Sequence, residues 1–555
     1  MKTNIGNRSL KCNKEIMKAK FLFILIILLG FYLRIFKLQE FPATLYGDEQ
    51  AFAWNAYNIL KLGQDEFGTP FPLQFKSFGD YKAPIPVYLL VPFIKFLGLN
   101  SFAIRLPIVL ASILTILAAY LLSRLFLNQK TSLLVAFLLT ISPWHIHLSR
   151  GFFESTLSLL FFILGIYFIF RSKEKIGLMI LGMIFFGLSI YSYFTPRILI
   201  PFILIFILIY QFVLLNSKRI IFVRNYFVGF IVLLIISIPL INLTFLGGGS
   251  RMSYLLKDTD KKIVDTVNTE RFASNLSIPW RAKLHNKATV WARVITDNYL
   301  EHLSANFWYI YGDNSLRYFT GNMGMFYLLE FPFLIIGLYI LWKEKREVAI
   351  LFLCWILLAP IPASIVGRPF AVRSLALLPA PFIFVGYGIY KSLFYFRKSI
   401  LKWGIILALV FGFTISLGNL LIRYYFEYPV YAATWWGWEN KAALDYAKLR
   451  EKKFDQIFIS DFYSGAPLAF AVYNAYDPLK YRYSINHPVI MADGRRLIKL
   501  GKFYFGSLDI NAQRLRQNII PPRSLYIARP EEADSSEEIH APDDGRVIFK
   551  IYSIY

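Results

Sequence analysis

The sequence has few of the residues that build redox, disulfide or metal sites. Its 555 residues include two cysteines, Cys12 and Cys354, and six histidines. Two isolated cysteines form neither a disulfide framework nor a metal cluster of recognisable spacing. A glycine run, "LGGGSR" at 246–251, follows a long apolar segment and lacks the strand, loop and helix context of a phosphate-cradling motif. We therefore expect no redox chemistry and no nucleotide-binding fold.

Charged residues are also scarce, at 17% of the chain, whereas 56% of the residues are hydrophobic and 18% are aromatic. The mean hydropathy of +0.49 is higher than a soluble domain needs, so apolar side chains must face lipid. The formal net charge is +25, but Lys and Arg lie in short runs between hydrophobic segments instead of forming one basic face. The composition predicts a polytopic α-helical membrane protein, with membrane lipids as partners and no nucleic-acid partner.

Hydrophobic segments long enough to cross a bilayer recur along the chain, each needing about 20 mostly apolar residues. Residues 1–20 form a basic tail that we place in the cytoplasm. The apolar run after it has no small-residue cleavage site, so we expect a retained first helix and not a cleaved signal peptide. We predict about eleven transmembrane helices plus interfacial helices, with spans near 21–38, 104–123, 131–148, 155–170, 176–193, 198–215, 226–245, 324–342, 348–366, 371–391 and 402–422.

The segment 83–98, "APIPVYLLVPFIKFLG", is ambiguous because it is short and carries three prolines and a lysine. It either spans the membrane or lies in the interface. If it lies in the interface and the N-terminus is cytoplasmic, the basic runs "SRLFLNQK", "RSKEK", "NSKRIIFVRN", "WKEKRE" and "FRKSILK" all face the cytoplasm, as the positive-inside rule requires. We therefore predict an interfacial helix, and extracytoplasmic positions for Asp48, Glu154, the loops 39–103 and 246–322 and the C-terminal region.

The chain changes character after about residue 425. "FDQIFISDF", "KFYFGS", "SLYIARP" and "RVIFKIYSIY" have the composition of strands, and "NKAALDYAKLREK" and "GAPLAFAVYNAY" that of helices. The acidic stretch "RPEEADSSEEIHAPDDG" is more typical of a solvated loop than of a site. We predict a transmembrane domain at 21–425 and a small extracytoplasmic α/β domain at 426–555.

On this topology, ionisable and tyrosine side chains from distant segments meet near the outer membrane face. Ionisable groups at helix ends near hydrocarbon are costly to place, which makes them functional candidates. Cations on the outer side also depart from the positive-inside rule; an anionic ligand such as a phosphate would account for them, and so would pairing with Asp48 or Glu154. The candidates for binding a lipid phosphate or substrate are Lys82, Tyr191, Tyr193, Arg197, His302, Asn306, Arg317, Arg368 and Arg373.

Asp48 and Glu49 lie in "LYGDEQAFAWNAYNILKLG", at the start of an amphipathic stretch. One interpretation makes Asp48 a helix N-cap, with Glu49 in the first turn. The other makes Asp48 a general base that takes a proton from an acceptor hydroxyl as the hydroxyl attacks a sugar carbon. The two interpretations are compatible if the helix cap uses one carboxylate oxygen of Asp48 and leaves the other free.

Lys82 and Glu154 also have structural alternatives. Lys82 precedes the proline-rich segment, where it either anchors that segment by snorkelling or neutralises a lipid phosphate as the sugar departs. Glu154 is either an i,i+4 partner of Arg150 or a second acid that holds a sugar hydroxyl. His145 and His147 flank the same turn, and we assign them to the polar interface and not to a metal.

Six segments carry a familiar order of motifs: "YGDEQAFAWNAYNIL", "YKAPIPVYLL…GLNSFAIRLP", "SRGFFES", "YSYFTPR", "EHLSANFWYIYGDNSLRYFTGNMGMFYLLEFPFLIIGL" and "LAPIPASIVGRPFAVRSLALLP". In this order they resemble the bacterial relatives of the dolichyl-phosphate-mannose protein mannosyltransferases, within the GT-C superfamily that also holds the lipid A aminoarabinose transferases. The resemblance covers roughly residues 20–420. It implies a GT-C-like fold, a polyprenyl-phosphate-linked sugar as donor, an extracytoplasmic acceptor and inversion at the anomeric carbon.

The same resemblance implies catalytic roles. It makes Asp48 the catalytic acid of the first loop, with Glu49 beside it. It makes Glu154 the acid of the second loop, where several relatives have aspartate. Lys82 matches the lysine near the lipid phosphate in the aminoarabinose branch.

The loop 246–322 is similar to the loop that covers the site in the family. His302, Asn306 and Arg317 fall at its polar positions. Packing within the loop is the alternative role for these three residues.

The sequence thus predicts a glycosyltransferase of the plasma (inner) membrane that transfers a sugar to a protein, lipid or glycan on the extracytoplasmic face. Its catalytic residues would be Asp48, Glu49 and Glu154. A divalent metal bridging the acids is compatible with these residues, but no ligand spacing indicates one. The rival is a transporter or flippase of lipid-linked sugars, which would show a polar path through the membrane and paired broken helices. A scaffold without catalysis would leave the paired acids unexplained beyond a helix cap.

Overall fold

The computed structural model describes residues 2–172, 175–213, 219–245, 251–396, 400–491, 494–508, 520–532 and 535–554; the glycine run at 247–249 lies outside them. The chain divides into two compact units. The first, here called the helical unit, comprises Met1–Phe36, Ile108–Ser149 and Phe153–Leu420. The second, here called the α/β unit, comprises Lys37–Pro107, Arg150–Phe152 and Leu421–Tyr555.

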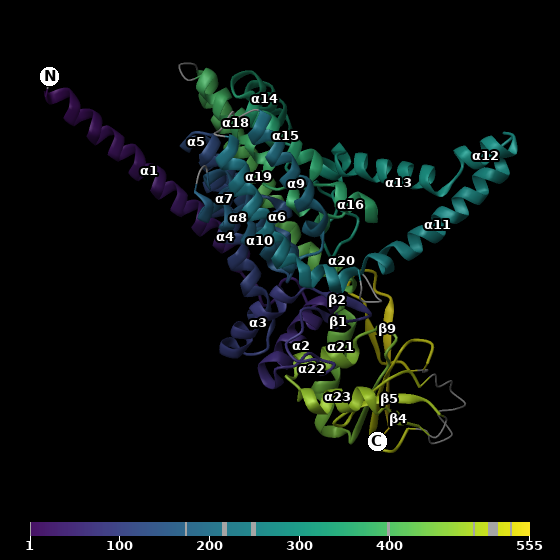
Figure 1. The fold of residues 1–555 in the computed structure, drawn as a ribbon. Coiled ribbons are helices and arrows are strands. Elements are labelled where there is room, and N and C mark those ends of the chain that lie inside the picture. Colours follow the sequence, from purple (N-terminus) through teal and green to yellow (C-terminus); the bar gives the residue numbers. More distant parts are fainter. Residues whose placement is uncertain are drawn as a thin grey trace. The chain divides into compact units, whose positions relative to one another are not determined.

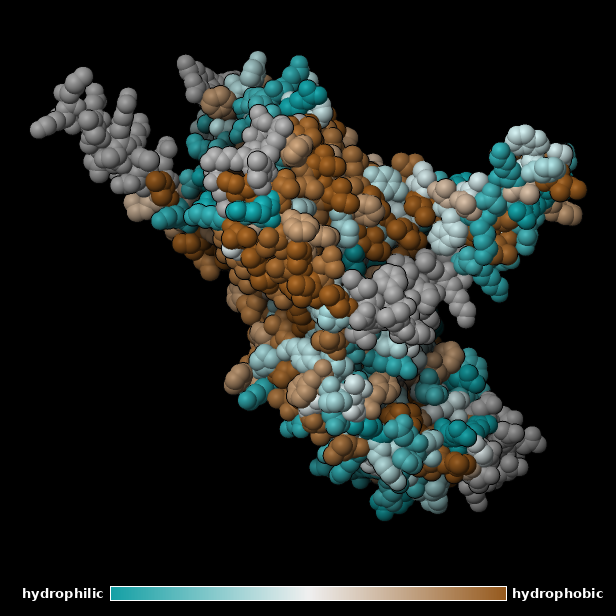
Figure 2. All heavy atoms as spheres, in the orientation of Figure 1, coloured by the Kyte–Doolittle hydropathy of each residue, from teal (hydrophilic) through white to brown (hydrophobic). Residues whose placement is uncertain are grey.

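The helical unit is a bundle of mostly apolar helices (Figure 1). Figure 2 shows hydrophobic side chains over much of the visible surface of this bundle, and side chains such as Leu407 are largely exposed. A surface of this kind is stable only against lipid. The helices are α1 (Lys2–Ile35), α4 (Ser101–Phe126), α5 (Gln129–Ile141), α6 (Pro143–Arg150), α7 (Glu154–Ser172), α8 (Ile176–Ser192), α9 (Thr195–Val213), α10 (Arg219–Phe245), α14 (Glu330–Glu344), α15 (Arg346–Leu358), α16 (Ile361–Val366), α17 (Ala371–Ser374), η2 (Leu375–Leu377), α18 (Ala380–Tyr395) and α19 (Ile400–Ile422).

Among the described residues, seven helices are long and apolar enough to cross a membrane, and two bent pairs raise the number to nine. The pairs are α5 with α6, bent by 53°, and α17–η2 with α18, bent by 54°. The predicted spans 176–193 and 324–342 correspond to shorter helices, α8 with 17 residues and α14 with 15. Each of the eleven predicted segments therefore overlaps a helix or a helix pair. The polytopic α-helical fold class is confirmed.

The region predicted as the loop 246–322 is largely helical. It contains α11 (Arg251–Ala273), α12 (Ile278–Leu284), α13 (Lys287–His302) and the π-helical turn η1 (Asn306–Ile310). The helices α11 and α13 pack together through Ile263, Val267 and Val290, and Glu270 pairs with Arg293 and His285 across them. Figure 1 shows these two helices extending away from the bundle.

The C-terminal part of the α/β unit is a mixed sheet of β3 (Gln456–Ile459), β4 (Val489–Ile490), β5 (Arg496–Leu500), β6 (Phe503–Phe505), β7 (Ser524–Ala528), β8 (Glu538–His540) and β9 (Val547–Ile554). The strand order is β4-β5-β6-β3-β7-β9-β8, with β3 parallel to β6 and β7 and the other pairs antiparallel. The four predicted strands are β3, β6, β7 and β9, and the two predicted helices are α21 (Trp438–Arg450) and α22 (Ala466–Tyr473). The domain boundary at residue 426 stays a prediction.

The sequence did not predict the shorter elements of this region. These are β4, β5, β8, α23 (Pro478–Asn486), α20 (Tyr428–Tyr431), η3 (Arg423–Glu427), η4 (Thr434–Trp436) and η5 (Glu451–Lys453). Seven of these segments have two to five residues and α23 has nine, which is too short for a recognisable periodicity.

The acidic stretch 529–545 is not simply a solvated loop, and that interpretation is wrong for two of its parts. Glu538–His540 forms the edge strand β8. Glu532 is fully buried, where it accepts hydrogen bonds from Tyr526 and Ser507 and pairs with Arg529 at 2.9 Å. A buried carboxylate needs such partners to offset its desolvation, so Glu532 has a structural role.

The first loop of the chain folds with the C-terminal region inside the α/β unit. It contains α2 (Gly47–Leu62), the hairpin of β1 (Phe75–Ser77) and β2 (Asp80–Lys82), and α3 (Pro84–Leu97). Trp54 packs edge-on against Tyr481 at 4.9 Å, and Arg482 donates to the carbonyls of Asp65 and Glu66 at 2.7 and 3.1 Å. The 14 residues of α3 reach about 21 Å, short of the roughly 30 Å of a bilayer core. Its interfacial position stays a prediction.

Candidate active site

The acid pair lies in the first turn of α2, but Asp48 is not its N-cap. The helix begins at Gly47, with Tyr46 in the N-cap position. The Glu49 carboxylate accepts a hydrogen bond from the Tyr46 backbone N–H at 3.3 Å, so Glu49, and not Asp48, makes the capping interaction at the start of the helix. Both carboxylates lie where the helix dipole favours negative charge. The N-cap interpretation of Asp48 is therefore wrong, because Tyr46 occupies that position.

Glu49 is fully buried in a bidentate ion pair with Arg105 of α4. The Arg105 Nε and Nη2 atoms donate to the two Glu49 oxygens at 2.9 and 3.1 Å, and the Phe152 backbone N–H donates to Glu49 at 2.8 Å. Arg105 also donates to the carbonyls of Leu38, Pro42 and Thr44. All five guanidinium N–H groups thus have acceptors. Arg105 lies in the first turns of α4, which belong to the α/β unit, so the pair holds the loop before α2 within that unit.

Arg105 is not among the residues that the sequence predicts for the site. The available signal was a lone arginine near the start of the apolar segment "SFAIRLPIVLASIL". A charge placed in such a segment needs a partner. The sequence could not say that this partner was Glu49, 56 positions earlier.

Asp48 forms an ion pair with Lys82, whose side chain is 4% exposed while that of Asp48 is 34% exposed. The hairpin brings Lys82 to this position, because Lys82 ends β2 opposite Phe75. The ammonium also lies 6.0 Å from the centre of the Phe52 ring. A snorkelling lysine would keep its ammonium in water, so that alternative is wrong. The structure brings these two predicted residues together.

Arg150 and Glu154 are not one turn apart on a single helix. The helix α6 ends at Arg150 and α7 begins at Glu154. Arg150 lies over the rings of Tyr424 and Tyr425 at 5.1 and 5.2 Å and donates to the Phe41 carbonyl at 3.2 Å. The helical i,i+4 spacing therefore does not account for Glu154, a buried residue in the first turn of α7.

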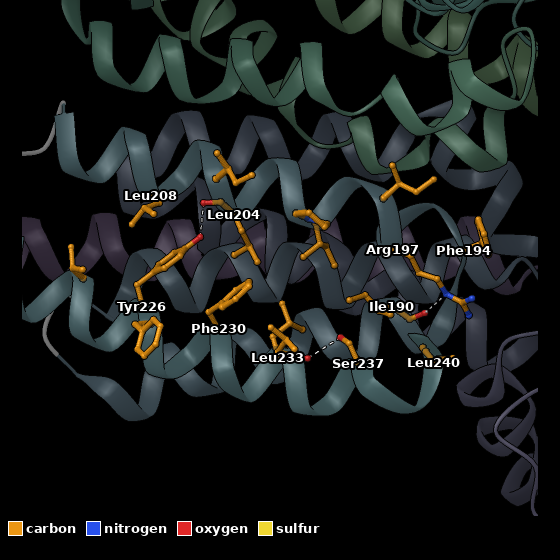
Figure 3. Close-up of a pocket in the computed structure, with 17 residues that line it drawn as sticks. Ile190, Phe194, Arg197, Leu204, Leu208, Tyr226, Phe230, Leu233, Ser237 and Leu240 are labelled. Atoms are coloured by element: carbon orange, nitrogen blue, oxygen red, sulfur yellow. Dashed lines mark hydrogen bonds between the residues drawn. The ribbon is translucent and has the colours of Figure 1, made fainter. Parts of the chain in front are cut away.

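In the helical unit, α8, α9 and α10 enclose an apolar groove of about 790 Å³ (Figure 3). Among the described residues that line it, Arg197 is the one charged side chain. Figure 3 shows Arg197 at one end of the groove with Phe194, and Leu208 and Tyr226 at the other. The Arg197 Nε donates to the Ile190 carbonyl at 3.4 Å. The groove thus has a long apolar body and one cationic end.

Two small cavities of about 20 and 10 Å³ adjoin the cationic end of the groove. The larger shares Phe194 and Ile198 with the groove, and both cavities are lined by Tyr193, Thr195 and Arg373. Three predicted residues, Tyr193, Arg197 and Arg373, therefore lie along one row of cavities. Tyr191 does not line these cavities, although it senses the charge of Arg197, and its hydroxyl donates to the Ile236 carbonyl at 2.8 Å.

His302 and Asp313 are buried in the helical unit, where both sense the charge of Arg373. Burial lowers the pKa of His302 to about 4, although a hydrogen bond to the Asn298 carbonyl opposes that shift and Arg373 adds to it. His302 is therefore neutral at pH 7. Burial raises the pKa of Asp313 to about 6, against the hydrogen bonds that its carboxylate accepts from Ala371 and Ser315. Asp313 could not be predicted from the sequence, since one aspartate in a polar turn carries no distinctive pattern.

We expect Asp313→Asn to change how stability depends on pH. The pKa of Asp313 is raised from 3.8 to about 6, so the folded protein binds this proton more tightly than the unfolded chain. The stabilisation is complete below pH 3.8 and is lost as pH rises through 6. The natural chain should exceed the variant in melting temperature at pH 4, where the variant lacks one acceptor worth about 1 kcal/mol. This difference should reverse by pH 7, because raising the pKa of Asp313 from 3.8 to about 6 costs the ionised form about 3 kcal/mol. A difference independent of pH would contradict the shifted pKa.

Of the remaining predicted residues, Arg368 and Asn306 lie at the surface and Arg317 is half-buried. Arg368 is 80% exposed and lies 3.9 Å from Glu301. Asn306 is exposed at the start of η1. The Arg317 carbonyl accepts from His147 Nε2 at 3.0 Å, since a carbonyl can only accept. No group of three His, Cys, Asp or Glu side chains able to hold a metal occurs in the described part of the chain.

The fold is similar to that of a solved structure over nearly its whole length. The whole chain matches ArnT from Cupriavidus metallidurans in the apo state, with a TM-score of 0.50 and 13% identity, over 96% of this chain and 98% of that chain. At this identity the match shows the fold alone. It agrees with the GT-C-like architecture that the sequence predicted.

The family is indicated by sequence as well. Residues 81–241 match the family described as dolichyl-phosphate-mannose-protein mannosyltransferase, which confirms the resemblance over that segment. The match contains Lys82, Arg105, Glu154 and the whole groove lining from Ile190 to Leu240. No curated protein matches the sequence.

Two further solved structures are similar at lower TM-scores. The archaeal oligosaccharyltransferase AglB from Archaeoglobus fulgidus, solved with an inhibitory peptide and a dolichol-phosphate, matches with a TM-score of 0.49 and 15% identity over 83% of this chain. The chain spans 63% of the length of that protein. ArnT from Cupriavidus metallidurans bound to undecaprenyl phosphate matches with a TM-score of 0.46 and 15% identity, over 83% of this chain and 75% of that chain.

Proposed function

We propose that this protein is a plasma-membrane glycosyltransferase that moves a sugar from a polyprenyl-phosphate donor to an acceptor on the extracytoplasmic face, with inversion. The observation that carries the proposal is an apolar groove with a cationic end, within the segment that matches the mannosyltransferase family. The acceptor is a protein, a lipid or a glycan of the cell envelope. The extracytoplasmic orientation follows from the basic runs between the spans.

The groove fits the two parts of a polyprenyl phosphate. From Arg197 to Leu208 along α9 is three helical turns, about 16 Å, close to the depth of one bilayer leaflet. Its apolar lining suits a branched hydrocarbon chain, and the Arg197 guanidinium suits a phosphate, which it can bind in bidentate fashion. Arg373 lines the adjoining cavities and supplies a second positive charge near this end.

The reaction needs a base and a stabilised leaving group. As the acceptor hydroxyl attacks the anomeric carbon, the new carbon–oxygen bond forms, the bond from that carbon to the phosphate oxygen breaks, and Asp48 takes the hydroxyl proton. The departing phosphate carries the electron pair, and its charge is stabilised by Arg197, Arg373 and Lys82. Attack from the face opposite the phosphate inverts the sugar. Glu154 would hold a sugar hydroxyl.

The contacts of Glu49 support a positioning role for this residue and not a catalytic one. Its two oxygens are engaged by Arg105, Phe152 and Tyr46. Asp48 has a carboxylate that is one-third exposed.

We expect Arg197→Gln to raise the KM for the polyprenyl-phosphate sugar by about tenfold, the loss of one charge-assisted contact worth roughly 1.5 kcal/mol. The assay measures sugar transfer by the purified protein in lipid nanodiscs, with synthetic donors and candidate acceptors. Arg224→Gln is the matched control, because Arg224 is exposed on α10 and does not line the groove. Equal KM values for both variants would contradict the role of Arg197, and consumption of no donor would contradict the proposed activity.

The second candidate, transport of a lipid-linked sugar, has one observation in its favour. The bent pairs α5–α6 and α17–α18 are broken helices, the feature expected of a transporter. However, Pro143 and Pro379 lie at the breaks, and proline ends a helix by itself. Movement of labelled donor lipid across the bilayer without sugar transfer would support the transporter.

A further inference from the structure

A second groove lies in the helical unit, between α1, α5, α18 and α19, with a volume of about 600 Å³. It shares no lining residue with the groove at Arg197. Its body is apolar, with side chains of Leu22, Ile26, Leu133, Leu134 and Phe137 among those that line it. The proposed reaction uses none of these residues.

Two lysines, Lys130 and Lys402, line this groove. Lys130 is the second residue of α5 and Lys402 the third residue of α19. Both lysines therefore stand in the first turn of a helix, where the helix dipole adds positive potential. Of the lining residues in the described chain, none is acidic, and the hydroxyl of Tyr390 is a further potential donor. An anion would be attracted to this end of the groove.

The surroundings of the groove indicate a lipid and not a protein as its occupant. Leu22 and Leu401 are more than two-fifths exposed, and Trp403 is two-thirds exposed, so the helices around the groove present apolar surface of the kind that contacts lipid. The same end of the unit carries the basic run 343–346, since the Lys345 ammonium donates to the Phe126 carbonyl at 2.7 Å, just before α5. Basic runs mark the cytoplasmic side, whose leaflet carries anionic lipids.

We propose that this groove binds an anionic phospholipid of the cytoplasmic leaflet, with one acyl chain between α1, α5, α18 and α19 and its phosphate between Lys130 and Lys402. The site does not depend on the identity of the donor or acceptor. Lys130 to Phe137 along α5 covers two helical turns, about 10 Å. That depth accommodates the glycerol and the upper part of an acyl chain within one leaflet of roughly 15 Å.

The test is the affinity of the purified full chain for its first phosphatidylglycerol, measured by native mass spectrometry during a lipid titration, with phosphatidylcholine as the neutral comparison. Each lysine near an anionic headgroup contributes roughly a factor of five. We expect Lys130→Gln/Lys402→Gln to weaken phosphatidylglycerol binding by about 30-fold and to leave phosphatidylcholine binding unchanged. Lys343→Gln/Arg346→Gln removes two charges from the neighbouring turn outside the groove and should weaken it less than threefold.

A third variant tests whether the acyl chain occupies the groove. Leu134→Trp keeps both lysines but fills the groove, and we expect it to weaken phosphatidylglycerol binding by about tenfold. Equal affinity of the natural chain for both lipids, equal weakening by the two double variants, or unchanged binding by Leu134→Trp would each overturn the proposal.

Discussion

Replacing Asp48 with asparagine is expected to lower acceptor-dependent sugar transfer by about 10²–10⁴-fold, the usual contribution of a general base. The amide oxygen of asparagine can still accept a hydrogen bond from Lys82 but cannot take a proton. The start of α2 should persist, because Glu49 and Arg105 hold it. The nearly buried Lys82 loses its counter-charge, so the melting temperature should fall, and turnover is compared on the folded protein. Turnover is measured in nanodiscs at saturating donor, so that a change in kcat is separated from a change in binding.

Glu40→Gln provides the matched control for Asp48. Glu40 belongs to the same loop, is 61% exposed and pairs with Lys37 at 3.5 Å. The Glu40→Gln substitution should change turnover less than twofold. A folded Asp48→Asn protein with full turnover would show that the base is another residue, and Glu154→Gln would then be the next variant. Loss of turnover together with loss of the folded state would instead assign Asp48 a structural role.

The second large effect is expected from Glu49→Gln, as a loss of stability. This change leaves the Arg105 guanidinium buried without its counter-charge, a situation that costs about 3–5 kcal/mol. For a unit of this size the melting temperature should fall by roughly 6–20 °C. Thermal unfolding of the detergent-purified protein, followed by tryptophan fluorescence, measures the effect, because Trp54 and Trp436 are buried in the same unit.

Two controls distinguish the effect of breaking the buried Glu49–Arg105 pair from the effect of removing a surface charge. Lys37→Gln removes one partner of the exposed Lys37–Glu40 pair and should cost less than about 1 kcal/mol. Arg105→Lys keeps the charge but provides three donors where the structure uses five, so it should destabilise nearly as much as Glu49→Gln. A melting temperature within 2 °C of the natural chain for Glu49→Gln would refute the structural role of the pair.

Hydropathy and strand composition were sufficient to predict the fold class, for a physical reason. A bilayer accepts only segments of a narrow range of length and polarity, so the eleven predicted segments overlap observed helices. The strands β3, β6, β7 and β9 are rich in β-branched and aromatic residues, which is the local preference of buried strands. The helices of the region 251–302 were missed because their polar faces carry no membrane signal.

The arrangement of the candidate site depends on contacts between distant residues, which a single sequence does not record. Asp48 and Glu49 are adjacent and chemically alike, yet Lys82 pairs with the first and Arg105 with the second. Helical rotation of about 100° per residue sends the two side chains in different directions. The sequence could identify the acids, but only the fold distinguishes the one-third exposed carboxylate from the buried one.

The packing of the first loop on the C-terminal region sets an order of events during synthesis. The backbone N–H of Leu45 donates to the Tyr473 hydroxyl, 428 positions later. At the usual 5–20 residues per second, a ribosome needs roughly 20–90 s to cover that distance. Throughout this interval the loop that carries Asp48 lacks its final partner. A mutation that slows folding of residues 421–555 would therefore prolong the exposure of a segment near the beginning of the chain to proteases and chaperones.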